Sequence, residues 1–323
     1  MKKIKIAFSD FWDVFDPNDN FITDALSKNF EVEISEDPDF VFCSIFGRKY
    51  LKYDCARIFY TGENIAPDFN LVDYGMGFPD ISFYDRYLRL PHYVLYPRAC
   101  TLALKKPYMS DEELTDRGFA SYVISNAISA PERGIMIEKL GKYKELASGG
   151  RYHNNVGGPV ADKIDFSKGY RFSLAFENSG SRGYTTEKIM ESFAAGSVPI
   201  YWGNPDIAGE FNPESFINCH DFAGFDEAVE FIKKVDGDDS LYLKMAKAPI
   251  LREDSSARKC LEEGYVADFL KEICSQEPID AIRRNRIYQG KYYEDEARFH
   301  QKIDRILYLP RRVARALRNR MKK

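Results

Sequence analysis

The stretch from Phe172 to Gly203 reads FSLAFENSGSRGYTTEKIMESFAAGSVPIYWG, and its pattern decides the fold of the region around it. An apolar run over 172–176 stops at a polar loop that contains two glycines. Apolar residues at helical spacing follow, Gly196 closes that segment, and a second apolar run reaches Gly203. The order strand, loop, helix and strand predicts a compact βαβ unit.

Polar side chains crowd the loop and the first helical turn of this unit. Ligands of open α/β sheets bind beyond the carboxyl ends of the strands, where the helices begin. That position holds Glu177, Asn178, Arg182, Tyr184, Glu187 and Lys188. The hydroxyl of Thr185 or Thr186 is expected to cap the helix by accepting a hydrogen bond from a free backbone N–H.

The charges of the first helical turn point to a nucleotide. A helix N-terminus attracts anions, so Lys188 opposes the helix dipole unless a bound diphosphate explains it. The Glu187 carboxylate repels phosphate but can accept two hydrogen bonds from a ribose diol. These features favour a sugar nucleotide as the ligand. From spacing alone, a capped surface helix with an incidental Glu-Lys pair stays open as an alternative.

Three segments of this stretch, FENS, YTTEK and AAGSVPIYWG, resemble in their order the signature of the α-1,3-fucosyltransferase family (glycosyltransferase family 10), which uses GDP-fucose. Earlier in the chain, FYTGEN, NLVDYGMGF and DRYLRLP are similar to segments of bacterial members. The resemblance implies an α/β fold of two Rossmann-like domains facing a cleft, the arrangement called GT-B. The N-terminal domain would bind the acceptor and the C-terminal domain GDP-fucose.

Two residues outside the stretch acquire roles from this resemblance. Glu63 stands at a turn after a predicted strand and matches the glutamate assigned as general base in bacterial members. By pattern alone it belongs to a polar turn. Arg133 ends the segment SNAISAPER, which resembles the family's segment with a phosphate-binding arginine. The alternative for Arg133 is exposure to water in the first turn of a helix, where a positive charge is unusual.

The reaction that the resemblance implies is inverting transfer of L-fucose from GDP-β-L-fucose to an oligosaccharide acceptor of the N-acetyllactosamine type. The product would carry an α-1,3 linkage to GlcNAc, as in Lewis X. No metal ion or cofactor is expected. The alternatives are an α-1,4 linkage or another acceptor on the same fold, and a non-catalytic protein that binds glycans or sugar nucleotides.

The resemblance also distributes roles over the candidate site. Glu63 would take the acceptor proton, and Arg133 and Lys188 would offset the charge of the departing GDP. Glu187 would hold the ribose. Asn178 and Tyr184 would contact the diphosphate or fucose, and Glu177 would offset the developing positive charge on the sugar.

A chain of 323 residues is long enough for two domains of ordinary size, and 44% hydrophobic with 30% charged residues indicates a globular body. We expect an N-terminal α/β domain over 1–116, a C-terminal α/β domain over 117–282 and a basic helical tail over 283–323. Residues 79–116 lack clear periodicity and are expected to form a loop-rich connector.

Two further motifs allow a ligand but do not require one. Gly149 and Gly150, followed by Arg151, lie in a polar segment that suits either a phosphate or a plain connector. Residues 236–239 read DGDD, which contains the DxD of metal-dependent glycosyltransferases. Because this motif follows a predicted helix and contains glycine, we interpret it as a turn.

The charge of the chain is unevenly distributed. Residues 274–323 hold 14 Lys and Arg against 6 Asp and Glu, a local charge of +8 in a chain of net charge −4. Val313, Leu317 and Met321 share one face of a basic helical pattern, which suits an anionic membrane surface. A disordered or partner-binding tail is the alternative, and no motif supports nucleic-acid binding.

The location of the protein is predicted from what the sequence lacks. No run of about twenty apolar residues suits a membrane span, and the N-terminal pattern is that of a strand rather than a signal peptide. The six cysteines form no CxxC pair and favour a reducing compartment. We therefore expect a cytoplasmic protein that can associate peripherally with the inner face of the cytoplasmic membrane.

Overall fold

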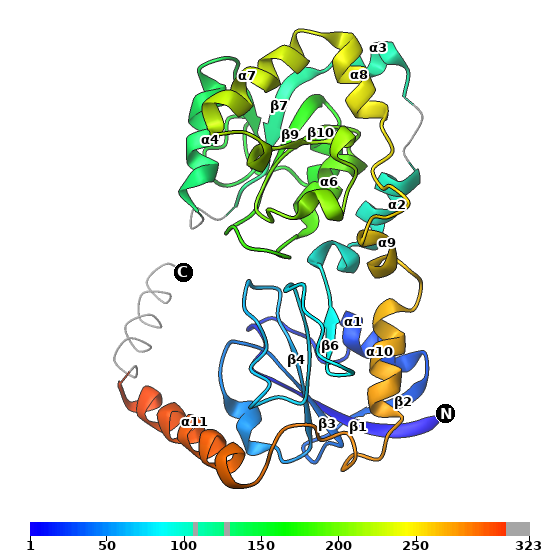
Figure 1. The fold of residues 1–323 in the computed structure, drawn as a ribbon, viewed down its shortest axis with the longest axis vertical. Coiled ribbons are helices and arrows are strands. Elements are labelled where there is room, and N and C mark those ends of the chain that lie inside the picture. The colour runs from blue at the N-terminus through cyan, green and yellow to red at the C-terminus, as the bar shows by residue number, and fades with distance from the viewer. Residues whose placement is uncertain (106–108, 126–129, 308–323) are drawn as a thin grey trace. The chain divides into compact units, whose positions relative to one another are not determined.

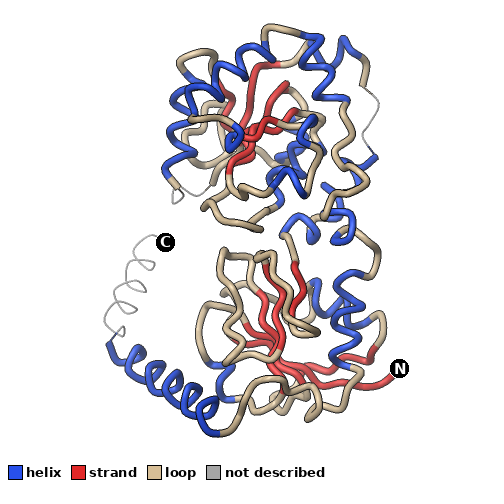
Figure 2. The backbone as a smooth tube through the Cα atoms, viewed as in Figure 1, coloured by secondary structure: helices blue, strands red, loops and turns tan. Residues whose placement is uncertain are grey.

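The fold is described from a computed structural model that covers residues 1–105, 109–125 and 130–307, with the side chains of 304–307 excepted. The chain divides into two compact units, and each is described by itself. Unit 1 contains residues 1–77, 81–88 and the chain from 266 onward, and unit 2 contains 78–80 and 89–265. Each unit is built on one sheet flanked by helices (Figure 2).

Unit 1 contains a six-stranded sheet with the order β2-β1-β3-β4-β5-β6. Its strands are β1 (Lys2–Ser9), β2 (Phe30–Ile34), β3 (Phe40–Cys43), β4 (Ala56–Tyr60), β5 (Tyr74–Gly77) and β6 (Tyr87–Arg89). The pairs from β2 to β5 are all parallel. Every residue of β3 and β4 is buried, as expected for inner strands of a parallel sheet that is covered on both faces.

The helices of unit 1 come from both ends of the chain (Figure 1). They are α1 (Phe21–Ser27), α10 (Tyr265–Cys274) and α11 (Tyr288–Leu307). Asn20 caps α1 by accepting hydrogen bonds from two backbone N–H groups of its first turn. Ala297 of α11 is buried in a hydrophobic cluster with Phe59 and Leu71, so α11 covers part of this sheet.

Unit 2 contains a five-stranded parallel sheet with the order β11-β10-β9-β7-β8. Its strands are β7 (Gly118–Tyr122), β8 (Leu146–Ser148), β9 (Tyr170–Phe176), β10 (Val198–Trp202) and β11 (Ile217–Asn218). In β9, Phe172 and Leu174 join the core on one face, and Ala175 joins the core on the other. This alternation explains the continuous apolar run in the sequence, because both faces are buried.

The helices of unit 2 are α2 (Pro97–Lys105), α3 (Asp111–Thr115), α4 (Pro131–Gly141), α5 (Lys163–Ser167), α6 (Glu187–Ala194), α7 (Phe225–Asp236), α8 (Asp239–Lys247) and α9 (Ala257–Cys260). The predicted βαβ unit is confirmed as β9, α6 and β10, with β9 and β10 paired in parallel. Gly196 follows α6 with a φ of 69°, a conformation that glycine adopts without strain.

The borders of the two units differ from the expected domains 1–116, 117–282 and 283–323. Residues 89–116 contain α2, which packs on α6 through Ala99 and Ala103 in the hydrophobic core of unit 2. They are therefore part of that unit and not a loop-rich connector. Residues 266–282 belong to unit 1, where Phe269 of α10 contacts Tyr74 of β5. Part of the expected basic tail is likewise a packed element, since α11 is anchored to the sheet of unit 1.

A buried cluster of charges provides that anchor. The Arg57 guanidinium donates to Glu294 on α11 over 2.8 Å, and its side chain is completely buried. Asp73 accepts from the Arg57 backbone N–H at 2.7 Å and forms a buried ion pair with Arg284. Because unpaired charges are very unfavourable in a protein interior, each member of this cluster depends on the others.

We predict that Glu294→Gln destabilises the protein, most strongly at neutral pH. Burial raises the pKa of Glu294, but the hydrogen bond and charge of Arg57 outweigh it and lower the pKa to about 2. Loss of one partner of a buried pair costs about 3–5 kcal/mol, and Gln keeps one acceptor, so we expect the lower end. A carboxylate with a lowered pKa contributes stability above its unfolded pKa and loses it as pH falls toward 2.

Urea unfolding at pH 7 and at pH 3 measures this effect. The difference between wild type and Glu294→Gln should shrink at pH 3, whereas Glu296→Gln, which changes an exposed glutamate of the same helix, should match wild type throughout. A difference that is the same at both pH values would show that the effect does not come from the ionised carboxylate of Glu294.

Only part of the sequence that bears on the predicted location lies within the described residues. Among the described residues, no helix is both long and apolar enough to cross a membrane. Val313, Leu317 and Met321, on which the predicted amphipathic face rests, lie outside the described residues. All six cysteines are free, and burial raises the pKa of the Cys55 and Cys100 thiols to about 11.

Candidate donor site

The loop between β9 and α6 is anchored by Glu177, which is completely buried. Its carboxylate accepts hydrogen bonds from the backbone N–H and the hydroxyl of Thr186, both at 2.7 Å, and from Lys188 at 3.0 Å. With its oxygens engaged by these donors, Glu177 positions the loop. The structure therefore shows a role for Glu177 in holding the loop, and the compensation of charge on the sugar stays a prediction.

The predicted helix cap is wrong in its chemistry. Thr186 is the N-cap residue of α6, but its hydroxyl donates to Glu177 and accepts from Lys188 instead of capping a backbone N–H. The Thr185 hydroxyl donates to Glu210 at 2.8 Å. The first turn of α6 therefore lacks a side-chain cap, which leaves its N–H groups for a ligand.

A second buried network of hydrogen bonds, centred on Glu210, holds the same loop. The sequence pattern does not predict it. Glu210 accepts from Arg89, Tyr93, Thr185 and Asn204 at 2.6–2.9 Å. Asn204 in turn accepts from the backbone N–H of Gly183, and Arg89 donates to the Gly183 carbonyl. The hydrogen bonds of this buried network hold the loop in one conformation.

Tyr184 is buried beside this network rather than open to a ligand. It is 2% exposed, and its ring meets Phe78 edge-to-face with centroids 4.6 Å apart. Gly183 has a φ of 81°, and a Cβ there would lie 2.4 Å from the Phe78 carbonyl oxygen. The close approach and the positive φ both require glycine at this position.

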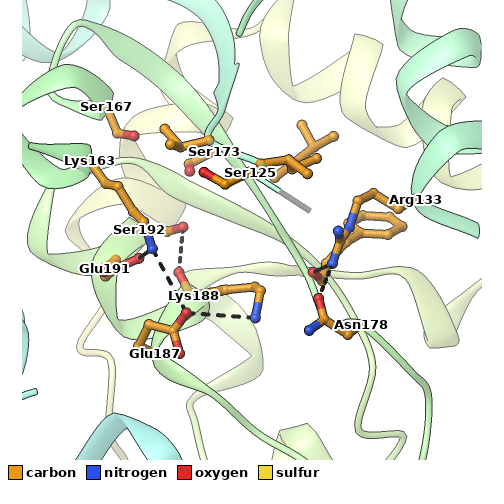
Figure 3. Close-up of a pocket in the computed structure, with 14 residues that line it drawn as sticks. Ser125, Arg133, Lys163, Ser167, Ser173, Asn178, Glu187, Lys188, Glu191 and Ser192 are labelled. Atoms are coloured by element: carbon orange, nitrogen blue, oxygen red, sulfur yellow. Dashed lines mark hydrogen bonds and ion pairs between the residues drawn. The ribbon is translucent and has the colours of Figure 1, made fainter. Parts of the chain in front are cut away.

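A cavity of about 230 Å³ opens beside the loop, beyond the carboxyl ends of β7 and β9 (Figure 3). It is lined by Val123, Ile124, Ser125, Arg133, Lys163, Ser167, Ser173, Leu174, Phe176, Asn178, Glu187, Lys188, Glu191 and Ser192. Four of the predicted site residues therefore meet at one cavity: Arg133, Asn178, Glu187 and Lys188. Tyr184 is not among the lining residues.

Arg133 is buried, so the alternative of a water-exposed arginine is wrong. Its Nη2 donates to the Phe176 carbonyl at 3.0 Å and to Asn178 Oδ1 at 2.7 Å. Among the described residues, no carboxylate lies within 4 Å of the guanidinium, and Nε has no hydrogen-bond partner. Burial lowers the pKa of Arg133 and the charge of Glu177 raises it in part, but an arginine stays charged. This leaves at the cavity a cation that has no ion-pair partner among the described residues.

Lys188 and Glu187 lie across the cavity from Arg133 (Figure 3). Burial lowers the pKa of Lys188, but Glu177 and Glu187 outweigh burial and raise it above its usual value. Burial likewise raises the pKa of Glu187, and contacts with His92, Lys188 and Lys163 outweigh burial and hold it well below its usual range. Both side chains are therefore charged at neutral pH.

Two helix N-termini add positive potential to these side chains. Arg133 stands in the first turn of α4, and the N-cap residue of that helix, Ala130, provides no side-chain cap. Lys188 stands in the first turn of α6, which also lacks one. Cationic side chains beside uncapped helix N-termini are a suitable environment for an anion such as a diphosphate.

Sequence reasoning missed a second ion pair at the cavity. Lys163, the first residue of α5, contacts Glu191 over 3.3 Å, one turn after Glu187 on α6. Burial raises the pKa of Glu191. The i, i+4 spacing of Glu187 and Glu191 on one helix was a usable signal, because it places both carboxylates on the same face.

Glu63 belongs to unit 1 and is described there. It stands three residues after the end of β4, and its backbone N–H donates to the Thr61 hydroxyl at 3.0 Å. Its side chain is exposed. The exposed position at a turn beyond a parallel strand is the one predicted, and its role as a base stays a prediction.

The glycine pair at 149 and 150 and the DGDD motif over 236–239 both make contacts within the protein. Gly149 and Gly150 pack closely on the chain, since a Cβ on Gly150 would lie 1.9 Å from the Ile124 carbonyl oxygen. In the DGDD motif, Asp236 is buried against Lys144 and Asp238 caps α8. Asp239 pairs with Arg171 at 2.8 Å. Each of these carboxylates is therefore engaged by the protein itself, in the turn between α7 and α8.

Two family models match the chain. Residues 6–96 match the alpha-(1,3)-fucosyltransferase FucT N-terminal domain, and residues 115–249 match glycosyltransferase family 10 (fucosyltransferase) C-term. An alpha-(1,3)-fucosyltransferase FucT from Helicobacter pylori is 37% identical over 283 residues, which is 75% of this chain and 59% of the relative. The mouse 4-galactosyl-N-acetylglucosaminide 3-alpha-L-fucosyltransferase 9 is 39% identical over 38% of this chain and 34% of its own length. The chain thus spans well under two thirds of these relatives.

The fold is also similar to solved structures. A crystal structure of α1,3-fucosyltransferase with GDP-fucose superposes with a TM-score of 0.74 at 32% identity, over 88% of this chain and 93% of that one. This likeness confirms the expected α/β fold of the GT-B class. From the matches over both parts of its sequence and over nearly the whole of a solved relative, the chain belongs to the α-1,3-fucosyltransferase family, glycosyltransferase family 10.

Proposed function

We propose that this protein is a glycosyltransferase that moves L-fucose from GDP-fucose to a sugar hydroxyl. The observation that carries the proposal is the cavity of unit 2, which Arg133 and Lys188 both line beside two helix N-termini that lack a side-chain cap. This arrangement suits a diphosphate, and Glu187 beside it suits a ribose diol. The similar crystal structure with GDP-fucose supports the same donor.

The reaction we propose proceeds with inversion. The acceptor oxygen attacks the anomeric carbon from the face opposite GDP, the bond to the phosphate oxygen breaks, and GDP departs with that electron pair. Glu63 takes the proton of the attacking hydroxyl. Arg133 and Lys188 stabilise the charge on the departing GDP, because preorganised cations at a leaving group lower the barrier.

For the acceptor we propose an N-acetyllactosamine-type glycan and an α-1,3 linkage to GlcNAc, which yields a Lewis X-type product. The support is the mouse relative, which is named for transfer to position 3 of a 4-galactosyl-N-acetylglucosaminide. We also propose a cytoplasmic location with peripheral association at an anionic membrane surface through the tail over 283–323, supported by the charge of +8 over residues 274–323.

The proposed function predicts one product among closely related acceptors. The protein is incubated with GDP-fucose and either Galβ1-4GlcNAc or Galβ1-3GlcNAc, and products are identified by mass spectrometry and linkage analysis. We expect fucose on position 3 of the β1-4 acceptor and little product from the other, where galactose occupies position 3 and position 4 is free instead. Product on the β1-3 acceptor alone would indicate an α-1,4 enzyme. Binding of GDP-fucose without any product on either would favour the non-catalytic alternative.

A further inference from the structure

The segment between β6 and α2 contacts the loop between β9 and α6, here called the donor loop, and the first turn of α6. Both contacts are made by His92. The backbone N–H of His92 donates to the Thr185 carbonyl at 3.1 Å, directly before the N-cap of α6. Its ring nitrogen Nδ1 lies 3.2 Å from Oε2 of Glu187, the first residue of that helix. One residue therefore bonds both the backbone of the loop and the carboxylate that follows it.

The His92 ring is held in place by its neighbours. It lies edge-on to Tyr96, with centroids 5.2 Å apart, and to Phe78, at 6.3 Å. Its side chain is 24% exposed. A ring fixed by aromatic neighbours and by its own backbone hydrogen bond presents Nδ1 in a constant direction. An ionised carboxylate can only accept hydrogen bonds, so Nδ1 carries the proton in this contact.

Glu187 depends on this contact for its orientation. Lys188 and Lys163 lie 3.7 and 3.9 Å from Oε1, which is too far for a hydrogen bond. In the part of the chain that the structure describes, His92 is thus the hydrogen-bond partner of the Glu187 carboxylate. The bond occupies one lone-pair site on Oε2 and leaves Oε1 with the rest of Oε2 for donors from a ligand.

We propose that His92 is a positioning residue, which holds the Glu187 carboxylate in the orientation that accepts both hydroxyls of a nucleoside ribose. The inference rests on the proposed function, because it takes a ribose diol as the ligand of Glu187. Without the His92 bond, the carboxylate can turn toward Lys163 or Lys188, and two hydroxyls in a fixed geometry then meet a mobile acceptor. His92 touches no reacting atom in this account.

The test compares GDP with 2′-deoxy-GDP by isothermal titration calorimetry. Wild type should bind GDP more tightly, since the deoxy ligand donates one hydrogen bond fewer to Glu187. In His92→Ala we expect about tenfold weaker GDP binding, within the range for a hydrogen bond to a charged group, and loss of the preference for GDP. His92→Asn, whose amide nitrogen replaces Nδ1, should keep most of the preference. His153→Ala, which removes an exposed histidine, should match wild type.

A double-mutant cycle separates positioning from mere structural support. If His92 acts through Glu187, then His92→Ala should have no further effect on GDP affinity in a Glu187→Ala background. In transfer assays, His92→Ala should raise KM for GDP-fucose and leave kcat nearly unchanged. Additive effects in the cycle, or equal weakening of both ligands by His92→Ala and by His92→Asn, would overturn the inference.

The experiments distinguish a failure of the proposed function from a failure of the role proposed for His92. If wild type binds neither GDP nor GDP-fucose, both the proposed donor and the role of His92 are lost. If wild type binds GDP and prefers it over 2′-deoxy-GDP, the donor proposal stands, and a preference that persists in His92→Ala overturns the positioning role alone.

Discussion

Glu63→Gln should abolish fucose transfer while GDP binding stays within about twofold of wild type. A general base contributes about 10²–10⁴ in rate, and glutamine keeps the shape of the side chain but cannot take a proton. GDP affinity should persist because Glu63 belongs to unit 1, whereas the proposed GDP-binding residues line the cavity of unit 2. Stability should also persist, because the Glu63 side chain is exposed.

The experiment measures kcat with saturating GDP-fucose and the Kd for GDP by calorimetry. Glu36→Gln, a change at another exposed glutamate of unit 1, serves as the matched control and should behave like wild type. Retention of more than about a tenth of the activity in Glu63→Gln would exclude a base role, given the range above. Loss of GDP binding together with transfer would place Glu63 in the nucleotide site instead.

Lys188→Ala should have the second large effect, and it should act on both binding and stability. A charge-assisted hydrogen bond to phosphate contributes about 1.5–3 kcal/mol, so GDP affinity should fall by about 10- to 150-fold. The same change leaves Glu177, which is 0% exposed, without its cation. Removing one partner of a buried pair costs about 3–5 kcal/mol, so unfolding should occur at distinctly lower urea concentration.

A second variant separates these two effects. In Glu177→Gln combined with Lys188→Met, the buried pair becomes neutral, so stability should recover in part, whereas GDP affinity should stay low. Lys168→Ala, at a half-exposed lysine outside the cavity, is the control for loss of a positive charge. If the combined variant regains GDP affinity along with stability, Lys188 serves the fold and contributes nothing to the ligand.

The sequence pattern predicts secondary structure correctly where the signal lies within the segment that forms the element. The apolar runs and the terminating Gly196 predicted β9, α6 and β10, because a parallel sheet covered on both faces gives continuous apolar strands. The sequence also contains local signals for other elements. Pro97 begins α2, and Ser110 with Glu113 forms the capping box that starts α3. Both signals lie within the segment that was expected to be a connector.

The contacts that shape the donor site could not be predicted in this way. Glu210, Arg89 and His92 reach the loop from segments whose spacing shows no relation to it, and their roles exist only in the folded unit. Local capping is the usual role of a threonine at the start of a helix, so the sequence predicts that the hydroxyl of Thr185 or Thr186 caps α6. A buried carboxylate nine residues before Thr186, that of Glu177, is the stronger acceptor and redirects the Thr186 hydroxyl.

The buried charges of unit 1 have a consequence for the order in which the chain folds. Arg57 and Asp73 belong to the first quarter of the chain, yet their partners Glu294 and Arg284 are 237 and 211 residues further along. Domains usually fold in the order in which they leave the ribosome. Here the whole of residues 89–265 emerges before those partners do. We therefore expect the buried charge cluster of unit 1, and the cover that α11 gives to its sheet, to form last, after unit 2 has already folded.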